Sequence, residues 1–130
     1  MTTKYIVNNL SGQTITNEPI LRPYKVYTAL LTQTGINPPV ATVLENTLGF
    51  IPTYSYNGTG NYSINSSSGF TSDKTVVFIT SESTDIIYST QVSSSEIIIG
   101  GVSDDLMSKT SIEIRVYLWV IIVYISILIL

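Results

Sequence analysis

Short runs of alternating hydrophobic and polar residues recur along the chain, separated by glycine, asparagine, proline and serine. Alternation with a period of two places successive side chains on opposite faces of a strand, so these runs predict β-strands. The clearest are YKVYTALLTQ (24–33), VATVLENT (40–47), KTVVFIT (74–80) and SIEIRVY (111–117). The second would also tolerate a short helix, although a strand is favoured.

The remaining runs are shorter and end in turn residues. KYIVNN (4–9) predicts a strand that leads into a polar connection, and FIPTYSYNGTGNYSI (50–64) predicts two strands joined by a tight turn at Asn57-Gly58. DIIYSTQV (85–92) and EIIIGG (96–101) follow. About seven to nine short strands at regular spacing are typical of an all-β fold. We predict an antiparallel β-sandwich, jelly-roll-like or barrel-like, with an apolar C-terminal extension.

The final stretch, RVYLWVIIVYISILIL, changes the pattern. Alternation is clean as far as Leu118, and from Trp119 onwards both faces of a strand would be apolar. We therefore divide the chain into an N-terminal strand and polar linker (1–22), a β-sandwich domain (23–118) and an apolar C-terminal extension (119–130).

The extension fits neither a single strand nor a membrane helix. As a strand, the residues from Val116 to the end would extend about 50 Å, which is too long for so small a domain. As a helix they would span about 22 Å, short of a hydrocarbon core of roughly 30 Å. We predict that the extension buries against another subunit as an added strand or swapped arm. Partial membrane insertion is a less favoured alternative, and a read-through artefact is the third. The candidate contact residues are Trp119, Ile121, Ile122, Tyr124, Ile125, Leu128 and Leu130.

Composition narrows the classes of function. Only 12% of residues are charged, with six Lys/Arg against nine Asp/Glu and a net charge of −3. Since no basic stripe is present to neutralise phosphates, we expect no nucleic-acid partner. The absence of cysteine and histidine removes thiol nucleophiles, the usual general base near neutral pH and the commonest zinc ligand. We therefore predict a non-enzymatic protein with no cofactor and no metal.

Asp104-Asp105 is the only acidic pair, and it lies in SDDLMSKT (103–110), which predicts one helical turn or a loop. A calcium loop or an acid–base site would need further carboxylates at defined offsets, and none follow. Ser103 as a helix N-cap, with two acids in the first turn, accounts for this stretch without assigning it a function.

Several blocks together resemble a known family. They are YKVYTALLTQTGINPPVATVLENTLG (24–49), the tyrosine-containing hairpin, FTSDKTVVFI (70–79) and the closing SIEIRVY. In combination they resemble a small β-domain that recurs in capsid decoration and fibre-like structural proteins of bacteriophages and environmental viruses. The opening KYIVNNLSGQTI is similar to segments that precede such domains. The resemblance implies a non-enzymatic virion structural or accessory protein, located in the virion, that acts through self-association or contact with other virion proteins.

The alternative function is a carbohydrate- or receptor-binding module. Tyr54, Tyr56 and Tyr62 flank the predicted hairpin turn, where exposed rings could stack on a glycan receptor or anchor a protein. A simpler interpretation is favoured, because tyrosine is a good strand residue that packs its ring while its hydroxyl reaches water.

Overall fold

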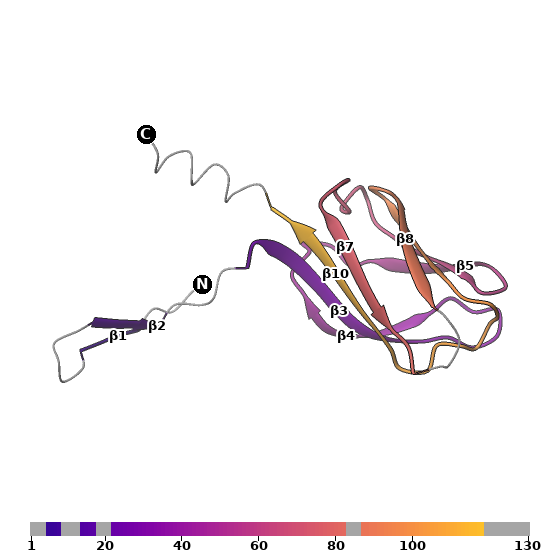
Figure 1. The fold of residues 1–130 in the computed structure, drawn as a ribbon, viewed down its shortest axis with the longest axis horizontal. Helices are drawn as coiled ribbons and strands as arrows, with labels where there is room; N and C mark the ends of the chain where they lie inside the picture. Colours follow the sequence, from indigo (N-terminus) through magenta and orange to yellow (C-terminus); the bar gives the residue numbers. More distant parts are fainter. Residues whose placement is uncertain (1–4, 9–13, 18–21, 83–86, 119–130) are drawn as a thin grey trace.

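The computed structural model describes residues 22–82 and 87–118, together with the backbone of two short N-terminal strands at 5–8 and 14–17. Eight strands in the main part form two antiparallel four-stranded sheets, which pack as a sandwich (Figure 1). No described residue lies in a helix. The predicted all-β antiparallel sandwich is confirmed.

The first sheet has the order β4-β3-β10-β7, and the second has the order β5-β6-β9-β8. The strands of the first sheet are β3 (Tyr24–Thr32), β4 (Val40–Asn46), β7 (Thr75–Thr80) and β10 (Thr110–Tyr117). Those of the second are β5 (Thr53–Gly58), β6 (Asn61–Asn65), β8 (Tyr88–Ser93) and β9 (Glu96–Gly100). Each of the eight lies within or at the border of a run that the sequence pattern identifies.

The N-terminal region holds one strand more than predicted. β1 (Tyr5–Asn8) matches the predicted strand, and it pairs with β2 (Thr14–Asn17) in a separate two-stranded sheet. The segment of β2 was expected to be part of a polar linker. Its sequence TITN places β-branched residues at three successive positions, and these favour a strand even in a polar context.

The hairpin between β5 and β6 turns two residues later than predicted. Asn57 forms a bulge in β5, Gly58 pairs with Asn61, and the turn itself falls at Thr59-Gly60. Gly60 has a φ of +66°, in the left-handed region that glycine adopts at low cost. The sequence holds two glycines within three residues, and the position of the bulge decides which of them closes the turn.

The core lies between the two sheets and draws on alternate residues of each strand. On β10 the predicted alternation is confirmed, because Ile112, Ile114 and Val116 are buried while the intervening side chains lie on the outer face. The other buried members of the core are Tyr27, Ala29, Leu31, Leu48, Tyr62, Ile64, Phe70, Ile97, Ile99 and Met107. Residues that face outward alternate with these core residues along the strands.

Candidate functional site

The outer face of the β4-β3-β10-β7 sheet carries an ordered cluster of charged and aromatic side chains. Strand alternation places Glu113 and Arg115 of β10 on this face. The antiparallel register then sets Glu113 between Thr28 of β3 and Phe78 of β7. Residues from three distant parts of the sequence therefore meet at one place, and we call them the outer-face cluster: Tyr24, Thr28, Phe78, Glu113 and Arg115.

Arg115 is held from several sides. Its guanidinium carbon lies 4.6 Å from the centre of the Tyr24 ring and 4.8 Å from the centre of the Phe78 ring, so it interacts with both π-systems. Its Nε and NH2 atoms lie 2.8 and 2.7 Å from Glu113 Oε2. A side-chain hydrogen bond with Tyr117, and next the bond to Glu113, raise the pKa of Arg115. The guanidinium group therefore has contacts with two aromatic rings and one carboxylate of its own domain.

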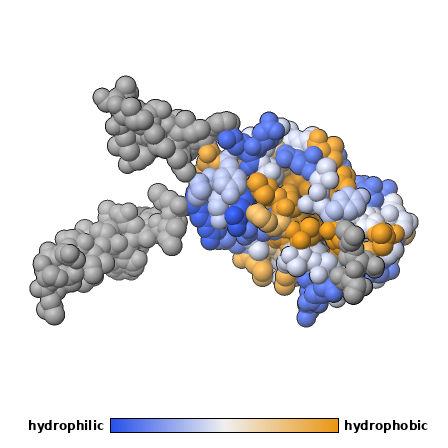
Figure 2. Space-filling view, viewed as in Figure 1, coloured by the Kyte–Doolittle hydropathy of each residue, from blue (hydrophilic) through white to orange (hydrophobic). Residues whose placement is uncertain are grey.

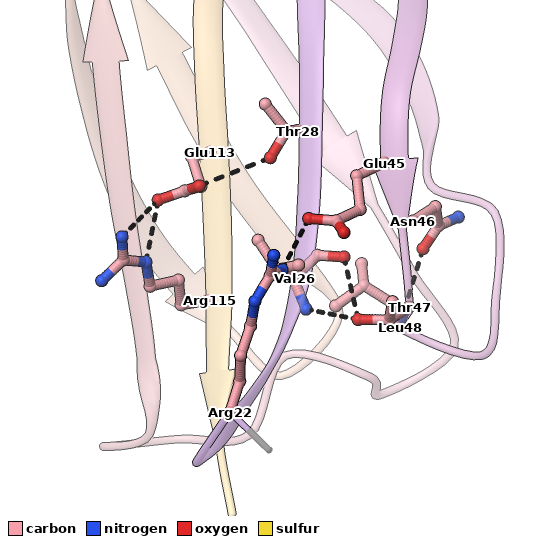
Figure 3. Close-up of polar contacts among 9 residues, drawn as sticks. All are labelled: Arg22, Val26, Thr28, Glu45, Asn46, Thr47, Leu48, Glu113 and Arg115. Carbon is pink, nitrogen blue, oxygen red and sulfur yellow. Dashed lines mark hydrogen bonds and ion pairs between the residues drawn. The ribbon is translucent and has the colours of Figure 1, made fainter. Parts of the chain in front are cut away.

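Glu113 joins the two central strands. While Oε2 accepts from Arg115, Oε1 accepts a longer hydrogen bond of 3.4 Å from the Thr28 hydroxyl, as Figure 3 shows. The Tyr24 and Tyr117 rings extend the cluster along the same pair of strands, with centroids 5.1 Å apart. Every charge of the cluster therefore has an opposite charge beside it.

A second ion pair lies where the chain enters β3. Arg22 NH1 is 2.6 Å from Glu45 Oε1 of β4, and hydrogen bonding to Glu45 raises the pKa of Arg22. Next to this pair, Thr47 secures the end of β4, because its Oγ1 accepts from Val26 N at 2.8 Å and its own N–H donates to Val26 O (Figure 3). These contacts fix the entering segment beside the edge of the sheet.

Exposed apolar side chains lie on both edge strands of this sheet. The register places Val76, Phe78 and Val40 on its outer face, whereas Val43 lies opposite the buried Ala29. On β7, Val76 and Phe78 are 40% and 48% exposed; on β4, Val40, Val43 and Leu44 are 65%, 48% and 61% exposed. On the face shown in Figure 2, hydrophobic residues gather across the middle of the sandwich with hydrophilic residues around them. Aromatic residues and arginine are both enriched in surfaces that contact other proteins.

The tyrosines of the hairpin belong to a different part of the molecule, and the structure does not present them as an open platform. Tyr62 is only 2% exposed, and its hydroxyl lies 2.9 Å from both Asp104 Oδ1 and Gln33 Oε1. Tyr54 is half-buried and its hydroxyl lies 2.9 Å from that of Tyr27. Burial raises the pKa of Tyr62 and of Tyr54. The ring of Tyr62 therefore packs in the core, in line with the favoured interpretation of the tyrosines and not with an exposed platform.

Asp104 organises this end of the sandwich. Its Oδ1 accepts from Gly60 N at 2.8 Å and its Oδ2 accepts from the Tyr56 hydroxyl at 2.9 Å. The bond from the Gly60 backbone is the main reason that the pKa of Asp104 is lowered, and the tyrosine hydroxyls lower it further. Residues 101–109 form a loop, so the expected helical cap at Ser103 is absent and Asp104 instead caps the β5–β6 turn.

Among the cavities lined by described residues, two lie beside Phe50. The larger, about 300 Å³, opens at the end of the sandwich where β10 finishes. It is lined by Lys25, Leu48, Phe50, Ser68, Gly69, Thr71, Val116, Tyr117 and Leu118. The smaller, about 230 Å³, lies beside Phe50 and Ile51. Within the described residues no group of three or more His, Cys, Asp or Glu side chains could hold a metal ion.

The predicted contact residues of the extension, Trp119, Ile121, Ile122, Tyr124, Ile125, Leu128 and Leu130, lie outside the described residues. Among the residues that the structure does describe, no helix is long and apolar enough to cross a membrane.

Sequence reasoning placed Glu113, Arg115 and Tyr117 on one face of the last strand but missed Tyr24 and Phe78 as their neighbours. The missing information was the register, because a period of two assigns faces without saying which strands pair. Family models, curated proteins and solved structures were all searched, and none matches this chain.

Proposed function

We propose that this chain is a non-enzymatic structural or accessory protein of a virus particle that acts through self-association, and that the β4-β3-β10-β7 sheet provides the contact surface. The viral setting rests on the sequence resemblance alone. The use of this sheet rests on the outer-face cluster and on the exposed apolar side chains of the same face.

The observation that carries the proposal is the presence of exposed apolar side chains beside a cluster of paired charges. Burying an isolated charge in an interface is costly, whereas a charge that already has its partner and its hydrogen bonds loses less on leaving water. Arg115 and Glu113 form such a pair, and Val76 and Phe78 beside them supply apolar area. The face can therefore be covered by a flat protein surface without leaving a charge unpaired.

The side chains of the cluster also contact one another within the domain, without a partner. A free arginine side chain loses considerable rotamer freedom when an interface forms around it. The contacts of Arg115 with the Tyr24 and Phe78 rings already restrict that freedom. Preorganisation of this kind lowers the entropic cost of association.

Light scattering on the full-length chain tests self-association through this face. Val76→Lys places a charge among the exposed apolar side chains of this face, so we expect a lower average mass at the same protein concentration. Val92→Lys is the matched control, because Val92 is 57% exposed on β8 of the other sheet. Equal masses for the two variants and the unsubstituted protein would contradict the proposed surface.

The viral setting needs its own test. Mass spectrometry of purified particles should find this protein in a constant ratio to the major coat protein. Its consistent absence from particles of the virus that encodes it would remove the structural role in the virion, even if the protein self-associates.

The glycan-receptor alternative stays a prediction and gains no support from the hairpin. Of its three tyrosines, Tyr62 is buried, and the hydroxyls of Tyr54 and Tyr56 bind other residues of the domain. On the outer face, Arg115 lies close to the Tyr24 and Phe78 rings against which a sugar would stack.

A further inference from the structure

We propose that the outer edge of β4 is the acceptor for the apolar extension of a second copy, whose residues 119–130 add to the sheet as a fifth strand. The inference rests on the proposed self-association and adds to the contact on the outer face a second contact at the β4 edge of the same sheet. Two observations support it. One side of β4 has no partner among the described strands, and the extension is apolar, as the exposed side chains of β4 are.

The first part of β4, residues 40–44, forms a largely apolar edge. Among the described strands, only β3 pairs with it, so its other side offers unpaired backbone groups. Residues 40–44 carry no charge and no proline, two of the devices that discourage strand addition, whereas the bulge at Leu44 and the charge of Glu45 protect the last part of the strand. Val40, Val43 and Leu44 are all roughly half exposed or more, at 65%, 48% and 61%.

The other three edge strands, β5, β7 and β8, are less suited to accept an apolar strand. β5 (TYSYNG) and β8 (YSTQVS) are mostly polar, so an apolar strand would gain little there. β7 is apolar, but it lies in contact with β8 of the second sheet. Of the four edges, β4 is therefore the one that combines apolar side chains with open backbone.

The extension has the composition and the length to fill this edge. Its sequence, WVIIVYISILIL, contains no charge and is rich in β-branched residues, which favour strands. Twelve residues extend about 40 Å as a strand, while the seven residues of β4 need only about 23 Å. About five residues, spanning roughly 16 Å, remain to cross between copies.

Contacts at the end of the sheet favour a second copy over the chain's own extension. β10 is separated from β4 by β3, and the segment that enters β3 lies at the same end. Leu118 N donates to Pro23 O at 2.9 Å, and Arg22 pairs with Glu45 of β4. A chain returning to its own β4 would have to cross this entering segment, and connections rarely cross on one edge of a sheet. Exchange between two copies needs no such crossing.

Because the natural chain contains no cysteine, disulfide trapping gives a direct test. One preparation carries Thr42→Cys on β4; the other carries a size tag and one of Ile122→Cys, Ile125→Cys or Leu128→Cys. Each chain holds one thiol, so a disulfide can form only between copies. Thr90→Cys, at an exposed position on β8, replaces Thr42→Cys in the control mixture.

We expect a mixed disulfide with Thr42→Cys for at least one extension position, and only background with Thr90→Cys. Equal yields from the two, or no trapping while light scattering still shows association, would overturn the β4 assignment and leave the proposed self-association intact. A further variant carries both thiols, one on β4 and one in the extension, in the same chain. If its monomer forms an internal disulfide, the extension pairs with its own β4 and the proposed exchange between two copies is wrong. A protein that stays monomeric in light scattering and yields no mixed disulfide would end both proposals.

Discussion

The Arg115 guanidinium of β10 lies 4.6 Å from the centre of the Tyr24 ring of β3, across the two central strands of one sheet. Phe78 of β7 approaches the same guanidinium at 4.8 Å. One cation therefore ties together three of the four strands of this sheet on its outer face. The arrangement makes a surface that is ordered, aromatic and internally neutralised.

Replacement of Arg115 should weaken the domain as well as the surface. Arg115→Gln removes the cation–π contacts and leaves Glu113 without its ion pair, so the urea midpoint of unfolding should fall. The urea midpoint of Arg115→Lys should fall less than that of Arg115→Gln, because lysine keeps the charge although it lacks the planar donor group. Lys25→Gln, at an exposed position on β3, is the control and should leave the midpoint unchanged. If all three variants unfold alike, the cluster does not contribute to stability.

The stability supplied by Asp104 should depend on pH. Its pKa in the folded protein lies below the usual 3.8, so the stabilisation is present above that value and is lost as the pH falls through the folded pKa. Asp104→Asn should therefore be less stable than the unsubstituted protein at pH 7, and the difference should shrink below about pH 4. Unfolding at a series of pH values measures this, with Asp73→Asn in an exposed loop as control. A difference that stays constant with pH would contradict the role of the carboxylate.

Thr110 offers a route to a more stable protein. It is fully buried, and its Oγ1 has no hydrogen-bond partner in the described structure. Thr110→Val keeps the shape and removes the unpaired hydroxyl, so the free energy of unfolding should rise by about 1 kcal/mol. Thr110→Ser keeps the hydroxyl and loses the methyl group, and it should destabilise. Calorimetry that finds Thr110→Val less stable would show that the hydroxyl has a partner, such as a water molecule.

Alanine substitutions at two glycines distinguish the cost of backbone strain from the cost of a steric clash. Gly35 and Gly60 have φ values of +57° and +66°, but a Cβ at Gly35 meets no atom within 4 Å while one at Gly60 would lie 2.3 Å from Gly101 O. Gly35→Ala should cost about 1 kcal/mol from strain alone. Gly60→Ala should cost clearly more, because the turn must also move away from Gly101. Similar losses in chemical denaturation would mean that the β5–β6 turn is looser than its contacts indicate.

The alternation of side chains was enough to predict the fold class and most strands. In SIEIRVY each apolar residue is buried and each polar one lies outside, as a strand covering a core requires. The sequence could not give the sheet order, since Tyr24, Phe78 and Arg115 meet only because β3, β10 and β7 are neighbours. It also could not show that Tyr62 is buried, because tyrosine suits both a core and an exposed strand face. The turn at Thr59-Gly60 depends on a bulge that no local pattern indicates.

Self-association through the β4-β3-β10-β7 sheet is tested most directly by hydroxyl-radical footprinting across a range of protein concentrations. Phe78 on this sheet and Tyr88 on the other are similarly exposed, at 48% and 52%, so each serves as a probe for its own face. We expect oxidation of Phe78 to fall as the protein concentration rises, while oxidation of Tyr88 stays constant. Constant oxidation of Phe78 in samples that light scattering shows to be associated would contradict association through this sheet.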